Sequence, residues 1–304
     1  MKKLLIPFLL LILIISACSN TSSKKDGTEA EKRAETFTYQ SETGPIEVPA
    51  HPQRVVVLSG YTGNILDLGV PVIGVDTWSK TNPTFVEELK DVKEVSEDDL
   101  EGILELEPDL IIALSTVKSL DKLSEIAPTV TYTWGKLDYL SQHIEIGKLL
   151  NKEKEASEWV DDFKQRAEKI GEEIRQKIGE DATVSVIEGF GKDLYVYGNN
   201  WARGTEILYQ TMKLKMPETV KNDALEAGYY TLSTEVLPEY AGDYIIFSKY
   251  SDADTSFQET DTYKNIPAVK NGHVFEMQGE GASFTDPITL ENQLEFFKEA
   301  FLGN

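Results

Sequence analysis

The sequence predicts an α/β protein of two Rossmann-like lobes joined by one long α-helix. Short continuous apolar runs, which are typical of buried parallel strands, recur in both halves of the chain with helical segments between them. Between the halves, residues 152–178 are rich in Glu and Lys, lack proline and carry apolar side chains at helical spacing. After a polar N-terminal region about 265 residues remain, which is enough for two lobes.

The first half is expected to hold strands at residues 55–58, 72–75 and 110–113, with helices that start near Thr62 and Leu100. The second half repeats the scheme, with strands at 183–187, 194–197 and 244–247 and a helix from about Gly204. We therefore assign residues 37–150 to an N-terminal lobe, 151–179 to the connecting helix and 180–304 to a C-terminal lobe. At 1.5 Å per residue the connecting helix would be about 40 Å long and would span both lobes.

Two glutamates occupy equivalent positions in a short motif that occurs once in each half of the chain. Glu101 follows a plausible helix N-cap, Asp99, by two residues, and Glu235 follows Ser233 in the same way. Eight residues after each glutamate an Asp precedes an apolar strand. Each glutamate is either a charge that favours the first turn of a helix or a functional group that both lobes share.

The first residues have the order of a cleavable export signal. Lys2 and Lys3 precede twelve apolar residues at 4–15, too few for a spanning helix, which needs roughly 20. Ile15-Ser16-Ala17-Cys18 resembles the bacterial lipobox, and Cys18 is the only cysteine of the chain. We predict that residues 1–17 are a signal peptide, that Cys18 carries lipid, and that residues 18–36 are a flexible tether to the outer face of a membrane.

Charge and motif content narrow the function. The formal net charge is −22, and removal of residues 1–17, which contain two lysines and no acid, makes it −24. That sign argues against nucleic acid as a partner and favours neutral or cationic ligands. The three histidines, His51, His143 and His273, lack metal-ligand spacing, so no resident metal is expected. A nucleophile elbow and a phosphate-binding loop are both missing from the sequence, so we expect no enzyme, and any nucleotide hydrolysis would have to come from partner subunits.

A segment of the second half gathers side chains that suit a bulky ligand. Tyr195 and Tyr197 alternate onto one face of a strand, and Trp201 and Arg203 follow in a turn before the next helix. Ligands of open α/β lobes gather at the carboxyl ends of strands. The alternative is that these aromatic side chains fill an ordinary loop.

The segment 195–204, together with residues 107–112, 127–130 and 240–244, resembles the ferric hydroxamate-binding lipoproteins of Gram-positive bacteria. The resemblance covers nearly the whole mature chain. It implies a periplasmic binding protein of the helical-backbone type, class III, anchored by lipid to the extracellular face of the cell membrane. Such a protein would be a monomer that hands a ferric siderophore to the permease and ATPase of an ABC importer.

The resemblance also implies site residues. Glu101 and Glu235 match the two glutamates that meet arginines of the importer. One departure is Ser283, which stands where close relatives carry Trp, beside Phe284. The positions that match the family's cleft residues are Tyr195, Trp201, Arg203 and Trp134, with Tyr61 and Trp78 as further candidates. Tyr197, on the same strand face as Tyr195, and Phe284, beside Ser283, complete the predicted siderophore-binding residues.

Charge favours a hydroxamate over a catecholate. A ferric tricatecholate carries about three negative charges, and its burial without a basic cluster is costly. The sequence offers one well-placed arginine, Arg203, whose replacement by Ala is expected to spare folding; Lys118 and Lys136 would add charge if they faced the cleft. A catecholate siderophore, haem and vitamin B12 stay open as other ligands of a binding protein, and an exported enzyme is the alternative of a different class. No cofactor is expected, since the chelator itself would carry the iron.

Overall fold

The N-terminal lobe is built on a five-stranded parallel sheet, in a computed structural model that describes residues 35–303. The predicted signal peptide, Cys18 and all but the last two residues of the predicted tether lie outside the described residues. Along β3 (Val55–Leu58) and β6 (Leu110–Leu114), alternate side chains enter two separate apolar cores, so both faces of the sheet are covered. In spatial order its strands are β5 (Lys93–Glu94), β4 (Val72–Val75), β3 (Val55–Leu58), β6 (Leu110–Leu114) and β7 (Thr129–Tyr132).

The C-terminal lobe holds a second five-stranded sheet with the corresponding strand order but mixed directions. Three strands are parallel, and two of them, at residues 184–190 and 244–249, were predicted. The predicted strand β9 (Asp193–Tyr197) departs from the repeated parallel scheme, since β9 and β10 (Tyr229–Leu232) are antiparallel to their neighbours. The reason is local: Phe190 pairs with Asp193, and only Gly191, with φ of +55°, and Lys192 lie between them. A two-residue turn can join only antiparallel strands. The strands are β10 (Tyr229–Leu232), β9 (Asp193–Tyr197), β8 (Val184–Phe190), β11 (Tyr244–Lys249) and β12 (Val274–Gln278).

The motif that occurs in both lobes has a structural basis in the aspartates that precede β6 and β11. The carboxylate of Asp109 accepts the backbone N–H groups of Gln53 and Arg54 at 2.7 and 3.0 Å, just before β3. The carboxylate of Asp243 accepts the N–H of Thr183 at 2.8 Å, just before β8. Each aspartate therefore ties the start of its own strand to the start of the neighbouring central strand.

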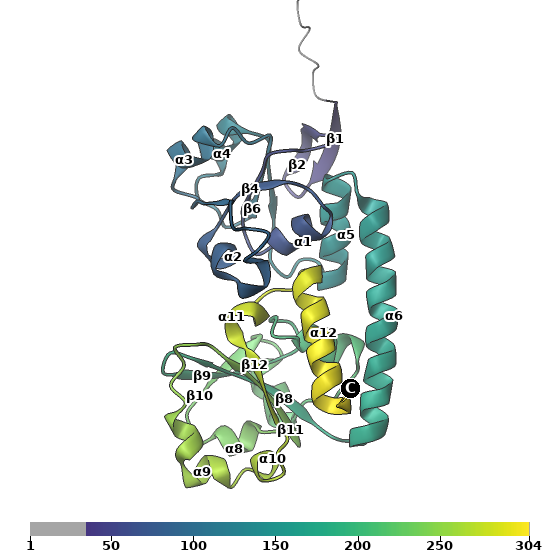
Figure 1. Cartoon of the computed structure of the whole chain (residues 1–304), viewed down its shortest axis with the longest axis vertical. Helices are drawn as coiled ribbons and strands as arrows, with labels where there is room; N and C mark the ends of the chain where they lie inside the picture. The colour runs from purple at the N-terminus through teal and green to yellow at the C-terminus, as the bar shows by residue number, and fades with distance from the viewer. Residues whose placement is uncertain (1–34, 304) are drawn as a thin grey trace, which may run out of the picture. The chain divides into compact units, whose positions relative to one another are not determined.

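One helix, α6 (Glu153–Ile178), joins the lobes and lies alongside both of them (Figure 1). Its 26 residues confirm the predicted connecting helix. A second helix, α12 (Pro287–Leu302), packs on α6 and also reaches α1 (Thr62–Asp67) of the N-terminal lobe (Figure 1). Although the sequence analysis did not predict α12, its ends carry clear signals, because Asp286 is the N-cap, Pro287 follows it, and Gly303 ends the helix in the left-handed conformation.

The remaining elements are a separate two-stranded hairpin and a set of shorter helices. None of the helices among residues 35–303 combines the length and the apolar character that a bilayer crossing requires. A hairpin precedes the first lobe, formed by β1 (Thr36–Ser41) and β2 (Gly44–Pro49). The other helices are α2 (Thr77–Thr81), η1 (Pro83–Phe85), α3 (Leu100–Glu105), α4 (Leu120–Ile126), α5 (Tyr139–Leu149), η2 (Glu206–Thr211, a π-helix), α7 (Glu218–Ala224), α8 (Leu237–Tyr240), η3 (Ser256–Glu259), α9 (Asp261–Lys264), α10 (Pro267–Lys270) and α11 (Gly279–Ala282).

The lobes meet at a close contact between α1 and the start of α12. A Cβ atom built on Gly63 would overlap the carboxylate of Asp286, which is itself 1% exposed. Nearby, the hydroxyls of Tyr139 in α5 and Thr211 in η2 share a buried hydrogen bond of 2.5 Å across the lobes. These contacts and the two helices restrict movement of one lobe against the other.

We predict that Gly63→Ala destabilises the protein by about 1–3 kcal/mol, because the added methyl forces α1 and α12 apart. Thermal and denaturant unfolding would measure the loss. Gly60→Ala is the matched control, since a Cβ there would lie 3.5 Å from the Phe284 ring, an ordinary contact. Equal stability of Gly63→Ala and the control would show that the lobes do not touch at this point.

A second prediction concerns Asp286. Burial raises the pKa of its carboxyl to about 6, against the bonds from Thr289 that lower it. A pKa that is higher in the folded than in the unfolded chain means that stability falls as pH rises from about 4 to about 6. Asp286→Asn, which keeps the cap, should therefore be more stable than the wild type by about 2 kcal/mol at pH 8 and no more stable at pH 4. Urea unfolding at both pH values tests this; a gain that is the same at pH 4 and pH 8 would contradict it.

Candidate ligand-binding cleft

A cavity of about 420 Å³ lies between the lobes at the carboxyl end of the N-terminal sheet. Its N-terminal wall consists of residues at or just after the ends of β3, β4, β6 and β7, as the rule for open α/β sheets predicts. Its C-terminal wall comes from the turn after β9 and from the segment after α11. The lining residues are Leu58, Ser59, Gly60, Asp76, Trp78, Leu114, Trp134, Arg203, Ser283 and Phe284.

Arg203 reaches this cavity through a turn of unusual backbone conformation. Ala202, Arg203 and Gly204 have φ values of +58°, +55° and +76°, a region that non-glycine residues rarely adopt. The N–H of Arg203 donates to the carbonyl of Ala282 at 2.8 Å, and a Cβ on Gly204 would overlap the ring of Phe297. Because β9 runs antiparallel to β8, the carboxyl end of β9 does not point to the cavity. The turn at residues 202–204 returns the chain to the cavity wall.

The Arg203 side chain is paired, which the sequence analysis did not foresee. Its Nε and Nη2 donate to the two carboxylate oxygens of Glu188 at 2.8 and 2.9 Å, and its guanidinium lies 4.8 Å from the centre of the Tyr197 ring. Burial alone would lower the pKa of Arg203, but the bonds with Glu188 hold that pKa above its usual value. The predicted lone guanidinium is therefore half of a buried, bidentate ion pair.

Glu188 is the centre of this network. Besides Arg203, its carboxylate accepts the hydroxyls of Tyr197 at 2.6 Å and Ser248 at 2.9 Å, and the residue is 2% exposed. Sequence reasoning missed it, although a glutamate within the apolar strand Val184–Phe190 was a visible signal, because a buried carboxylate needs a partner. Asp76, which lines the cavity at the end of β4, was missed as well.

The tryptophans of the N-terminal lobe are open to the cavity. Trp78 and Trp134 both line it, with 56% and 43% of their surface exposed. Trp134 also borders a small adjoining cavity of about 20 Å³, which Tyr61 lines. Tyr61 itself is buried and packs edge-on against Tyr132 at 5.6 Å, so its accessible surface is limited.

Three of the predicted aromatic residues of the C-terminal lobe lie in a neighbouring cluster. Tyr195 and Tyr197 share one face of β9 as predicted, and together with Trp201 they surround Tyr229 at centroid distances of 5.4 to 6.5 Å. None of these four lines the two cavities just described. Tyr229, which is 41% exposed, was not anticipated because it lies on β10, a strand that the sequence analysis did not predict.

Ser283 and Phe284, at the position where the resemblance implied a tryptophan, both line the main cavity. The hydroxyl of Ser283 shares a 2.6 Å hydrogen bond with that of Tyr250. Phe284 packs edge-on against Phe85 at 5.8 Å and is 4% exposed. Only a small part of the Phe284 ring therefore replaces the surface that a tryptophan would offer. Lys118 and Lys136 do not line the cavity.

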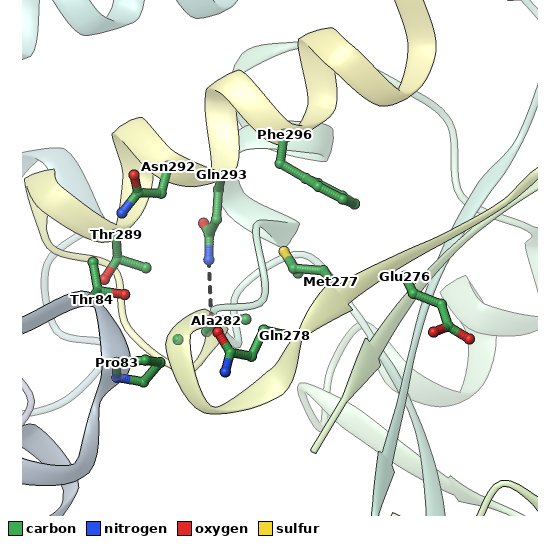
Figure 2. A pocket seen from close by; sticks show the side chains of 11 residues that line it. Pro83, Thr84, Glu276, Met277, Gln278, Ala282, Thr289, Asn292, Gln293 and Phe296 are labelled. Atoms are coloured by element: carbon green, nitrogen blue, oxygen red, sulfur yellow. Dashed lines mark hydrogen bonds between the residues drawn. The ribbon is translucent and has the colours of Figure 1, made fainter. Parts of the chain in front are cut away.

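A second cavity, of about 330 Å³, lies between η1 and the elements β12, α11 and α12 (Figure 2). Its walls include Met277 and Phe296, and Gln293 spans it to donate to the carbonyl of Ala282 at 3.1 Å. The residues that line it include no cation and neither exposed tryptophan. The cavity with Arg203, Trp78 and Trp134 is therefore the better match for the ligand predicted from the sequence.

Glu101 and Glu235, the two glutamates of the repeated motif, are both exposed but lie in different local structures. Glu101 lies in the first turn of α3, and Asp99 caps that helix by accepting the N–H of Gly102 at 3.0 Å. Ser233 is not the cap that the sequence predicted, because α8 begins only at Leu237 and Glu235 lies in the preceding turn. Hydrogen bonds, first from Ser233, lower the pKa of Glu235, so it is ionised at neutral pH.

Two α/β lobes, one connecting helix and a cavity at the ends of the strands between them define a two-lobed substrate-binding protein. The chain belongs to the periplasmic binding protein family, whose pattern matches residues 55–280. It is 38% identical to the iron(3+)-hydroxamate-binding protein FhuD of Bacillus subtilis, over 96% of this chain and 95% of that protein.

Solved structures agree with this assignment. The FhuD protein from S. pseudintermedius superposes with a TM-score of 0.78 at 32% identity, covering 89% of this chain and 99% of that one. FhuD2 from Staphylococcus aureus with bound ferrioxamine B superposes with the same TM-score at 33% identity, covering 83% and 99%. The sequence-based predictions of family and fold class are confirmed.

Proposed function

We propose that this protein captures ferric hydroxamate siderophores outside the cytoplasmic membrane and delivers them to an ABC importer. The observation that carries the proposal is the cavity between the lobes, where two exposed tryptophans face a single, charge-balanced arginine. The relative FhuD and the ferrioxamine-bound FhuD2, which resemble nearly the whole chain, support the same ligand class.

The cavity fits a bulky chelate of low charge. Its volume of about 420 Å³ lies in the range of small-molecule sites. A guanidinium has five N–H donors; Arg203 uses one at Nε, one at Nη2 and one, to the carbonyl of Trp201, at Nη1. Two N–H groups are therefore free to donate to hydroxamate oxygens, while Trp78 and Trp134 pack on the organic part of the chelate.

The rest of the proposal follows from the sequence. The chain would act as a binding protein without catalysis and without a resident cofactor, since the chelator holds the iron. Cys18 would carry the lipid that attaches the protein to the extracellular face of the cell membrane. The protein would work as a monomer with a permease and its ATPase.

Titration of intrinsic tryptophan fluorescence tests the ligand class. We expect quenching by ferrichrome and ferrioxamine B, because Trp134 and Trp78 line the cavity, and none by a ferric catecholate, haem or cobalamin. Arg203→Lys should weaken binding about tenfold or more, since an ammonium lacks the paired donor geometry. Arg166→Lys is the control, because Arg166 pairs with Glu291 away from the cavity. Stronger quenching by cobalamin, haem or a ferric catecholate than by ferrichrome and ferrioxamine B would show that the proposed ligand class is wrong.

Arg203→Ala is less suitable for this test than Arg203→Lys. The sequence predicted that the alanine variant folds normally, but the ion pair with Glu188 argues against that prediction. Removal of the guanidinium would leave Glu188 charged, buried and unpaired, a change that typically costs about 3–5 kcal/mol. The lysine variant keeps a positive charge next to Glu188.

The docking role of Glu101 and Glu235 is tested separately. We expect the double variant Glu101→Ala/Glu235→Ala to bind ferrichrome normally and to lose siderophore-dependent iron uptake by cells. Glu105→Ala/Glu239→Ala is the control, because both residues are exposed and lie close by in the same regions, in α3 and α8. Normal uptake with the first double variant would refute the docking role.

A further inference from the structure

The main cavity contains charges of both signs, and their balance was not evident from the sequence. Arg203 and Asp76 are the ionisable residues among those that line it. Glu188 lies directly behind Arg203, with 3% of its side chain exposed against 13% for Arg203. The positive charge at the cavity wall is thus already neutralised by a fixed partner.

Asp76 adds a negative charge from the opposite lobe. Its two carboxylate oxygens accept the N–H and the hydroxyl of Ser79, each at 3.0 Å. Within residues 35–303 no lysine, arginine or histidine forms an ion pair with it. Lys136, which follows Trp134 in the same loop, pairs instead with Glu42 at 3.3 Å.

Burial raises the pKa of Asp76, and the bonds from Ser79 oppose that rise. A partly desolvated carboxylate without a cationic partner gains most from a cation that enters the same space. The other groups that approach this carboxylate, the backbone N–H groups of Trp78 and of Asp76 itself, are neutral donors and bring no balancing charge.

On the basis of the function proposed above, we propose that the cleft sorts ferric hydroxamates by charge. Glu188 cancels the charge of Arg203, and Asp76 leaves the cavity wall with one negative charge, so that a cationic chelate binds more tightly than a neutral one and an anionic chelate binds least. Asp76 would face the pendant ammonium of a cationic chelate, whereas Glu188 acts through Arg203 as a positioning residue.

A charge series of one chelate tests this directly. Ferrioxamine B has a pendant ammonium, its N-acetyl derivative is neutral and its N-succinyl derivative is anionic, while the iron-binding hydroxamates are the same in all three. With the wild-type protein we expect affinity to fall in that order, by about tenfold per charge.

Asp76→Asn retains the helix cap and should bring the cationic and neutral chelates within about twofold of each other. Glu188→Gln should shift preference towards the anionic derivative, because Arg203 then keeps a net positive charge; circular dichroism would test whether this variant folds. Asp91→Asn is the control, since Asp91 is exposed in the same lobe and lines none of the cavities described above. Its charge preference should equal that of the wild type.

The outcomes separate this inference from the proposed function. If the wild type binds all three derivatives equally well, or if Asp76→Asn leaves their order and spacing unchanged, charge sorting is wrong while hydroxamate binding stands. If none of the three derivatives nor ferrichrome binds, the proposed function itself fails.

Discussion

The cleft depends on the buried pair of Arg203 and Glu188. One carboxylate on β8 receives the guanidinium from the turn after β9, the hydroxyl of Tyr197 from β9 and the hydroxyl of Ser248 from β11. A buried carboxylate is costly without such partners, so the four bonds fix the position of every group that makes them. The left-handed turn at residues 202–204 is held in the same way, because its conformation is unfavourable by itself and is stabilised by tertiary contacts.

The lobes provide a largely preformed site around that pair. α6 lies alongside both lobes, and α12 reaches from α6 to α1 (Figure 1). The contact of Gly63 with Asp286 leaves no space for a side chain between α1 and the start of α12. A ligand that enters such a site is recognised mainly by the shape and charge that the protein already presents. Preorganisation of this kind lowers the entropic cost of binding.

The charges of this protein discriminate between ligands both at long range and inside the cavity. The formal net charge of −22 produces a field that disfavours anionic ligands before contact. Inside the cavity, the pairing of Arg203 removes the local attraction that a single arginine would give, and Asp76 lies without a cationic partner among the described residues. The surface and the cavity therefore discriminate in the same direction, and the cavity does so at short range, where salt screens less.

The sequence by itself determined what depends on local patterns. The buried strands β3, β4, β6 and β11, the long helix α6 and the composition of the aromatic turn followed from apolar runs, helical spacing and residue type. Only the tertiary structure decided which groups meet, because contacts between distant residues leave no periodic signal. It reversed β9 through a two-residue turn, placed Tyr195 and Trp201 beside Tyr229 outside the main cavity, and paired Arg203 with a carboxylate fifteen residues away in sequence.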